Sequence, residues 1–140
     1  MDVTADLDAP HPPERVHAVV ADLGTYPRWL DIVTRAERDG DAWSVDLRGR
    51  LGPFARSKRL RMVRTALEAP THARFERAEV DGRSHSPWVL DAKVAPHADG
   101  SRLTMHLHYG GGLWMPVLER ILRDEIERSR ARLLSVLADG

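Results

Sequence analysis

Residues 100–122 read GSRLTMHLHYGGGLWMPVLERIL, a pattern that indicates a strand running directly into a helix. Apolar and polar side chains alternate between Arg102 and Tyr109, as expected for a strand with one buried face. The glycines at 110–112 allow close backbone approach where the strand folds back as a helix across its own sheet. Pro116 then suits the first helical turn. We therefore expect the C-terminal helix to lie on a sheet that contains this strand.

One long amphipathic helix is predicted over residues 113–138. One side of its helical wheel is apolar and the other is charged, so the apolar side is expected to cover a sheet. Glu119–Arg123 and Asp124–Arg128 have the i,i+4 spacing of stabilising ion pairs on the exposed side. The apolar face contains Trp114, Met115, Leu118, Ile121, Leu122, Ile126, Leu133, Val136 and Leu137.

The N-terminal part of the chain predicts one strand followed by two short helices. Apolar and polar residues alternate over residues 1–8, which indicates a half-buried strand. The prolines at 12–13 suit the first turn of a helix whose apolar stripe ends at Gly24. Thr25 is predicted to cap a second short helix over residues 25–30.

The middle of the chain predicts antiparallel hairpins. Asp-Gly pairs at 39–40, 81–82 and 99–100 separate alternating runs, and this dipeptide is a strong hairpin signal. A meander of six strands follows from this spacing. The strands are expected near residues 32–38, 42–50, 56–67, 72–80, 85–95 and 101–109.

This order of elements resembles the START/Bet v 1-like (SRPBCC) superfamily, in particular its polyketide cyclase/dehydrase and lipid-transport branch. The resemblance is carried by VTADLDAP at 3–10, by PERVHAVVADLGTYPRWLD at 13–31, by the hairpin-rich middle and by the stretch at 100–122. It implies an α+β helix-grip fold, in which a curved antiparallel sheet wraps around the long C-terminal helix and encloses a hydrophobic cavity. We expect one such domain over residues 1–140. The superfamily includes carriers as well as cyclases, so the fold does not decide between these functions.

Composition limits the classes of function. The 21 basic and 21 acidic side chains balance, so bulk charge gives no reason to expect nucleic acid or an anionic membrane as a partner. Cysteine is absent, which excludes disulfides, thiol nucleophiles and thiolate metal sites. No apolar run approaches the ~20 residues that span a bilayer, and the N-terminus is unlike a signal peptide. We expect a cytoplasmic protein, monomeric or weakly dimeric, without a cofactor.

A hydrophobic cavity between the sheet and the C-terminal helix is the expected ligand site. Pockets for small ligands usually measure about 300–1,000 Å³. Inward-facing side chains of the strands and the helix are predicted to line it. These are Trp43, Leu47, Met62, Phe75, Trp88, Leu90, Met105, Tyr109, Trp114, Leu118 and Leu122.

Glu125 and Ser129 are polar residues within the apolar stripe of the predicted helix, and both are candidate ligand-binding residues. A buried carboxylate is costly unless it is paired or hydrated. Two interpretations of Glu125 remain open. It forms a salt bridge with an inward arginine, such as Arg64 or Arg77, or it contacts a hydroxyl or carbonyl group of a ligand in the cavity.

Two further features concern metals and anionic partners. His106 and His108 share the outer face of their strand and could both reach one metal ion. No third ligand is identifiable, so we expect surface histidines and no metal site. A basic stretch without acidic residues predicts a charged outer sheet surface or, as an alternative, a site for an anionic partner such as RNA. Its members are Arg48, Arg50, Arg56, Lys58, Arg59, Arg61 and Arg64.

Three functions are compatible with these residues. The leading hypothesis is a non-enzymatic protein that binds a hydrophobic small molecule, such as a lipid, isoprenoid, polyketide or aromatic compound. The second is a polyketide cyclase/dehydratase-type enzyme, for which Glu125, Tyr109 and Arg77 are the candidate proton donors or acceptors. The third is an interaction module that uses the basic stretch at 48–64. The sequence contains no catalytic motif that would identify an enzyme.

Overall fold

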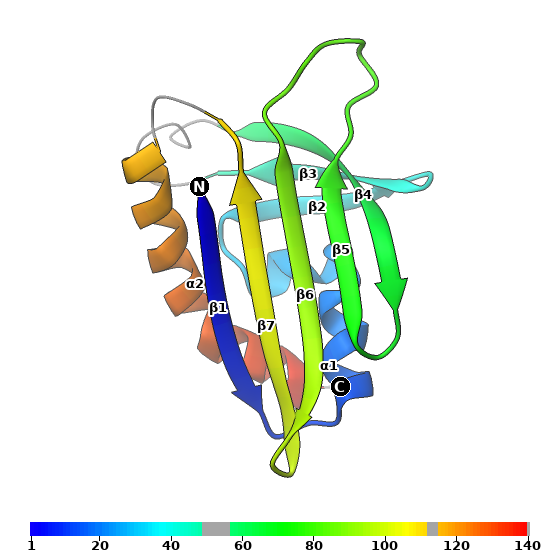
Figure 1. The fold of residues 1–140 in the computed structure, drawn as a ribbon, viewed down its shortest axis with the longest axis vertical. Helices are drawn as coiled ribbons and strands as arrows, with labels where there is room; N and C mark the ends of the chain where they lie inside the picture. The colour runs from blue at the N-terminus through cyan, green and yellow to red at the C-terminus, as the bar shows by residue number, and fades with distance from the viewer. Residues whose placement is uncertain (49–56, 112–114, 140) are drawn as a thin grey trace.

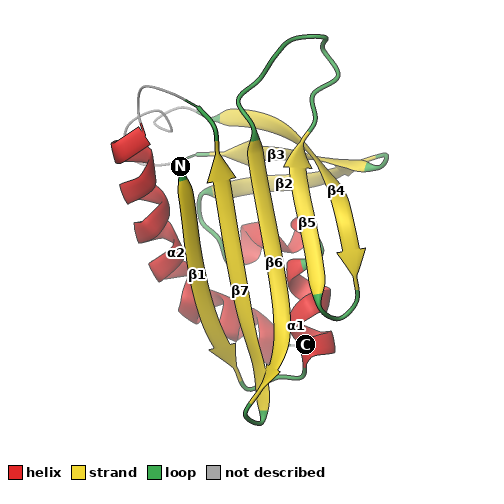
Figure 2. Ribbon diagram, in the orientation of Figure 1, coloured by secondary structure: helices red, strands yellow, loops and turns green. Residues whose placement is uncertain are grey.

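The computed structural model describes residues 1–48, 57–111 and 115–139, which form a curved antiparallel sheet with helices on one side (Figures 1 and 2). The predicted helix-grip fold is confirmed. Along the chain the elements are β1 (Asp2–Ala9), α1 (Pro13–Val20), the 3₁₀ helix η1 (Leu23–Arg28), β2 (Val33–Asp39), β3 (Ala42–Leu47), β4 (Lys58–Glu68), β5 (His72–Arg77), β6 (Trp88–His97), β7 (Gly100–Tyr109) and α2 (Met115–Ala138).

The sheet has seven strands in the order β1-β7-β6-β5-β4-β3-β2, so β1 and β2 are its two edges. The strand near the N-terminus therefore pairs with the last strand, and Ala5 lies opposite Met105. Figure 1 shows β2 and β3 crossing the direction of β1, β7 and β6 at a steep angle, which makes the sheet strongly curved. This curvature creates a concave face that the helices cover.

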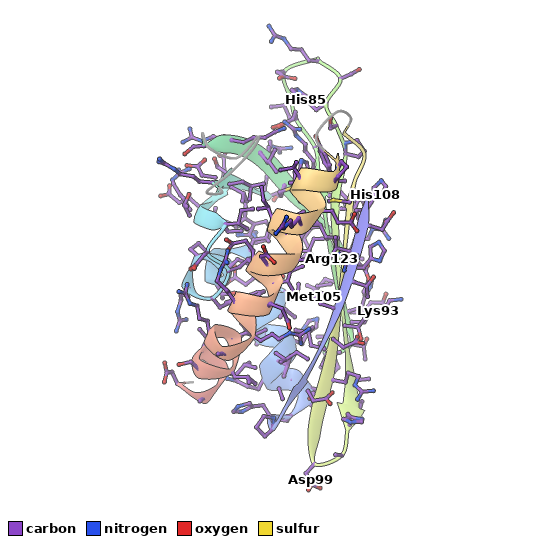
Figure 3. All side chains as sticks on the ribbon, turned by 90° about the vertical axis from the view of Figure 1, so that its left-hand side faces the viewer. His85, Lys93, Asp99, Met105, His108 and Arg123 are labelled. Atoms are coloured by element: carbon purple, nitrogen blue, oxygen red, sulfur yellow. The ribbon has the colours of Figure 1, made fainter. Side chains whose placement is uncertain are left out.

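The two faces of the sheet follow the alternation of the sequence. In β7, Leu103 is buried, and Met105 packs against the core from the concave face. His106 and His108 lie on the opposite, outer face, as predicted. Figure 3 shows Met105 between the sheet and α2, whereas His108 and Lys93 point away from the helices. The pattern at 100–122 was therefore sufficient to orient this strand.

Tight hairpins form at two of the three Asp-Gly pairs, with Gly40–Asp41 and Ala98–Asp99 as the turn residues, and the third pair forms none. Gly40 has a φ of 60° in the turn between β2 and β3, a value that glycine adopts without steric cost. Gly82 lies within the longer connection between β5 and β6, so the predicted strands at 72–80 and 85–95 extended too far toward each other. Beyond the end of β5, the carboxylate of Glu79 accepts the backbone N–H of Arg61 on β4 at 3.0 Å.

The two N-terminal helices differ in detail from the prediction. α1 ends at Val20 instead of continuing to Gly24, and the residues that follow form η1. Thr25 was predicted to cap the second helix, but Asp22 does so by accepting the backbone N–H of Gly24 at 2.9 Å. The Thr25 hydroxyl instead donates to the carbonyl of Val19 at 2.7 Å, which ties η1 to the end of α1.

α2 lies across the concave face, as the apolar stripe predicted. Leu118 is 2% exposed, and the predicted Glu119–Arg123 ion pair is present at 2.9 Å. The predicted Asp124–Arg128 pair was wrong, because Arg128 pairs with Glu125 instead. Residues 113 and 114, at the start of the predicted helix, lie outside the described part of the chain.

The C-terminal end of α2 is held by a side chain from α1. Arg15 donates from Nε to the carbonyl of Leu137 at 3.2 Å and from Nη2 to that of Val136 at 3.1 Å. These carbonyls belong to the last turn of the helix, where no intrahelical partner is available. Arg15 thus connects the two helices and satisfies backbone acceptors at the same time.

We expect Arg15→Met to lower the free energy of unfolding by about 1–2 kcal/mol, because it removes two hydrogen bonds from a cation to helix carbonyls but keeps the aliphatic stem. Urea denaturation monitored by circular dichroism measures the change. Arg123→Met is the matched control, and its loss should stay within ~0.5 kcal/mol because it breaks only an exposed ion pair. Equal losses in the two variants would contradict a capping role for Arg15.

Candidate functional site

A cavity of about 90 Å³ lies between the concave face of the sheet, η1 and α2. Among the described residues the lining is almost entirely apolar, and its charged members belong to β1 and α2. β1 contributes Val3, Ala5, Asp6 and Leu7; η1 and the residues after it contribute Tyr26, Trp29, Leu30 and Ile32; β6 and β7 contribute Leu90, Leu103, Met105 and Leu107; α2 contributes Leu122, Glu125, Ile126, Ser129, Arg130 and Leu133.

The cavity lies where a small side chain interrupts a row of larger ones. In β1 the inward positions are Val3, Ala5 and Leu7, and Ala5 lies opposite Met105 of β7. Alanine does not reach far enough to fill the space beneath α2, so a gap remains between the two layers. Met105 is unbranched and flexible, which lets the wall adapt to what occupies this space.

Glu125 is the acidic group that α2 places inside this apolar environment. Its side chain is 5% exposed, and Oε1 accepts a hydrogen bond from Nη2 of Arg128, one turn further along the helix. Oε2 is buried and has no hydrogen-bond partner among the described residues. Ser129 lies on the same wall, but its hydroxyl donates to the carbonyl of Ile126 at 2.7 Å. A residue of the cavity lining therefore holds one buried carboxylate oxygen without a partner among the described residues.

The interpretation that Glu125 forms a salt bridge with a strand arginine such as Arg64 or Arg77 was wrong. Arg64 donates to the carbonyl of Ala21 at 2.9 Å, and Arg77 lies 3.2 Å from the carboxylate of Glu79. Both arginines thus have partners of their own. Glu125 finds its cation on its own helix.

The edge strand β1 and α2 form two walls of the cavity, and a hydrogen bond joins them across the seam between the two elements. Arg130 reaches across this seam and donates to the backbone carbonyl of Asp6. The same guanidinium lies 2.7 Å from Oε2 of Glu127. Because β1 has a strand on only one side, its free edge offers carbonyl groups to α2. Arg130 is therefore the polar contact that joins the two walls here.

The structure brings together only part of the predicted site. Leu90, Met105, Leu122, Glu125 and Ser129 line the cavity. The remaining aromatic and aliphatic candidates lie outside its lining and pack against one another. Six of them are buried in the core: Trp43, Leu47, Met62, Phe75, Trp88 and Leu118. Tyr109 packs against Trp88 with ring centroids 4.5 Å apart. Trp114 lies outside the described residues. The volume is also smaller than the predicted 300–1,000 Å³.

Sequence reasoning missed the contribution of η1 to the lining. Tyr26 and Trp29 both line the cavity, and their rings lie with centroids 4.5 Å apart at an interplanar angle of 45°. Burial raises the pKa of Tyr26, whose hydroxyl donates to the carbonyl of Val20 at 2.8 Å. The aromatic residues in TYPRWL were visible in the sequence. Their position under α2 depends on how η1 packs, which no local pattern reports.

The two histidines of β7 lie on the outer face, away from the cavity. Nε2 of His106 and Nδ1 of His108 lie 2.8 Å and 3.0 Å from the same carboxylate oxygen of Asp2. Hydrogen bonds from His106 and then His108 hold the pKa of Asp2 below its usual value. In the described ranges 1–48, 57–111 and 115–139, no group of three or more His, Asp or Glu side chains is arranged to hold a metal ion.

The basic stretch does not form one continuous surface within the described residues. Arg59 pairs with Asp46 at 2.8 Å, whereas Arg64 contacts the ring of Trp43 from the inner side. Arg61 donates to the carbonyl of Ala78 at 2.7 Å. Its cations are thus divided between the two faces of the sheet. Arg50 and Arg56 lie outside the described part of the chain.

The chain matches a family model described as polyketide cyclase / dehydrase and lipid transport over residues 1–138. Similar solved structures include a START superfamily protein from Mycobacterium smegmatis, with 13% identity, coverage of 99% of this chain and 97% of that chain, and a TM-score of 0.74. A protein from Thermus thermophilus has 20% identity, coverage of 99% and 95%, and a TM-score of 0.67. Ara h 8.0201 has 10% identity, coverage of 100% and 99%, and a TM-score of 0.66. No curated protein matches the chain.

Among the described residues, no helix is both long enough and apolar enough to cross a bilayer.

Proposed function

Because the chain belongs to the polyketide cyclase / dehydrase and lipid transport family, we propose that it binds a hydrophobic small molecule in the cavity between the sheet, η1 and α2. The observation that supports this proposal most directly is the apolar cavity with one unpaired carboxylate oxygen, Oε2 of Glu125. Apolar pockets with a few converging polar groups are typical of small-molecule sites. An apolar ligand would fill the space, and its polar group would lie at Glu125.

The volume of the cavity limits what fits without movement. About 90 Å³ is less than the ~150 Å³ of an engineered apolar cavity that takes up benzene or xenon. A ligand of the size of benzene or larger therefore requires the walls to move apart. The seam between β1 and α2 is the place for this movement, because Arg130 joins the walls there through a carbonyl of an edge strand.

An enzymatic role would depend on the same cavity. Among the three candidate proton donors or acceptors, Glu125 lines it, whereas Arg77 pairs with Glu79 and Tyr109 packs against Trp88. A cyclase or dehydratase would thus use the free oxygen of Glu125 as its proton acceptor. Turnover of a polyketide-like substrate that is lost in Glu125→Gln would identify this second function.

Filling the cavity tests the proposed site. We expect wild-type protein to take up xenon and toluene, and Ala5→Leu, which adds three carbon atoms at the wall opposite α2, to abolish this uptake. Apolar cavities of this kind bind such probes without polar contacts. Methyl chemical shifts of the lining leucines, followed by NMR as each probe is added, measure the uptake.

Ala95→Leu is the matched control, because it makes the same change in a strand at an exposed position. It should bind both probes as wild type does. Native mass spectrometry of gently purified protein then identifies any natural ligand by its mass. Wild-type protein that takes up neither probe and carries no ligand would contradict the proposed function.

A further inference from the structure

We propose that the ligand carries a neutral hydrogen-bond donor, such as an alcohol or phenol hydroxyl, which it donates to Oε2 of Glu125. This inference rests on the proposed function, since it specifies the chemistry of the molecule in the same cavity. It predicts that the site prefers hydroxylated apolar molecules to hydrocarbons of the same shape and to carboxylic acids.

The two carboxylate oxygens of Glu125 have unequal environments. Oε1 of Glu125 accepts a charge-assisted hydrogen bond from the guanidinium of Arg128, whose side chain is 46% exposed. Oε2 is buried at the cavity wall and has no partner among the described residues. An anionic oxygen removed from water accepts hydrogen bonds strongly and donates none. The group that completes the site must therefore be a donor.

The hydrogen-bond donors of the side chains around the cavity already have acceptors. The hydroxyl of Ser129 donates to Ile126, and that of Tyr26 donates to Val20. The guanidinium of Arg130 is directed to the carbonyl of Asp6 and to Glu127. The indole N–H of Trp29 points to the hydroxyl of Thr25 at 3.5 Å. In this arrangement none of these side chains donates to Oε2.

The chemistry of Oε2 disfavours several classes of ligand. A ligand carbonyl or ether oxygen at this position would place two acceptors against each other. A ligand carboxylate would add a second negative charge to an apolar space that already holds one, which is unfavourable for both. A hydroxyl reproduces the hydrogen bond that a water molecule would make to Oε2, so its entry costs the site no polar contact.

The test compares three single-ring probes that differ in one group. Toluene, phenol and benzoate are titrated into wild-type protein, and dissociation constants are obtained from methyl chemical shifts. We expect phenol to bind roughly tenfold more tightly than toluene, the size expected for one hydrogen bond to a charged acceptor. Benzoate is expected to bind more weakly than toluene.

Two substitutions at the same position isolate the carboxylate. In Glu125→Leu the preference for phenol over toluene should disappear, because the acceptor is gone. In Glu125→Gln the preference should also be lost, because Arg128 holds the single amide oxygen and the NH2 group, a donor, takes the place of Oε2, while binding of benzoate should improve relative to wild type. Glu119→Gln, on the exposed part of the same helix, is the control and should leave all three constants unchanged.

The outcomes separate this inference from the proposed function. Equal affinities of phenol and toluene for the wild type, or a phenol preference that survives in Glu125→Leu, would overturn the inference while leaving the cavity a binding site. Failure of both rings to bind wild-type protein would instead count against the proposed function itself.

Discussion

Phe75→Ala is expected to lower the free energy of unfolding by about 3–5 kcal/mol, the cost of removing a fully buried aromatic ring. Phe75 is 0% exposed at the centre of the sheet's concave face. Its ring meets Trp43 edge-on with centroids 5.6 Å apart and Tyr26 at 6.4 Å, so its loss breaks contacts with both the sheet and η1. Urea denaturation followed by tryptophan fluorescence and by circular dichroism measures the effect.

Two control variants show whether the loss comes from the ring's position in the core. Phe75→Leu keeps most of the apolar volume and should cost clearly less than the alanine variant. Leu67→Ala removes an apolar side chain that is 49% exposed at the end of β4, and its effect should stay within ~0.5 kcal/mol. A loss below ~1 kcal/mol for Phe75→Ala would mean that the ring is not part of a tightly packed core.

Phe75 also illustrates what periodicity can and cannot predict. Alternation in β5 correctly placed its side chain on the inner face, because period two reports which face of a strand is buried. It could not tell whether the residue lines a cavity or fills the core. That difference depends on the curvature of the sheet, which brings Trp43 from β3 and Tyr26 from η1 against the ring.

The ends of elements depended on single side chains in the same way. The hairpin signal at Asp39–Gly40 was sufficient, since a two-residue turn contains its own conformational requirement. The pair at 81–82 had the same sequence but lies in a longer connection between β5 and β6, where the carboxylate of Glu79 accepts the backbone N–H of Arg61 on β4. This contact joins residues 18 positions apart, so the local sequence pattern could not predict it.

Glu125, in contrast, is a residue of the candidate site that could be predicted from the sequence for a physical reason. A carboxylate within an apolar helical stripe has to be buried if the helix covers the sheet, and the side chain is 5% exposed. Its partner was beyond the reach of sequence reasoning, because several arginines were available. Arg128 fits because the i,i+3 spacing on a helix brings the two side chains together without bringing a strand cation into the core.

Glu125→Leu should raise the free energy of unfolding by about 1–3 kcal/mol, because it removes a buried, unpaired anionic oxygen and puts apolar atoms into an apolar cavity. Breaking a buried ion pair is normally costly, since the remaining charge is stranded. Here the remaining charge is that of Arg128, whose side chain is 46% exposed and can be hydrated by solvent. Thermal and urea denaturation of wild type, Glu125→Leu and Glu125→Gln measure the change.

The glutamine variant is the matched comparison, since it keeps the shape of the side chain and removes only its charge. It should gain less than leucine, because its amide remains a polar group in the cavity. A loss of stability in Glu125→Leu would contradict this account and would show that the Glu125–Arg128 pair is required for packing. A gain in stability combined with loss of phenol preference would mean that the native residue is unfavourable for folding and retained for binding, a conflict characteristic of functional sites.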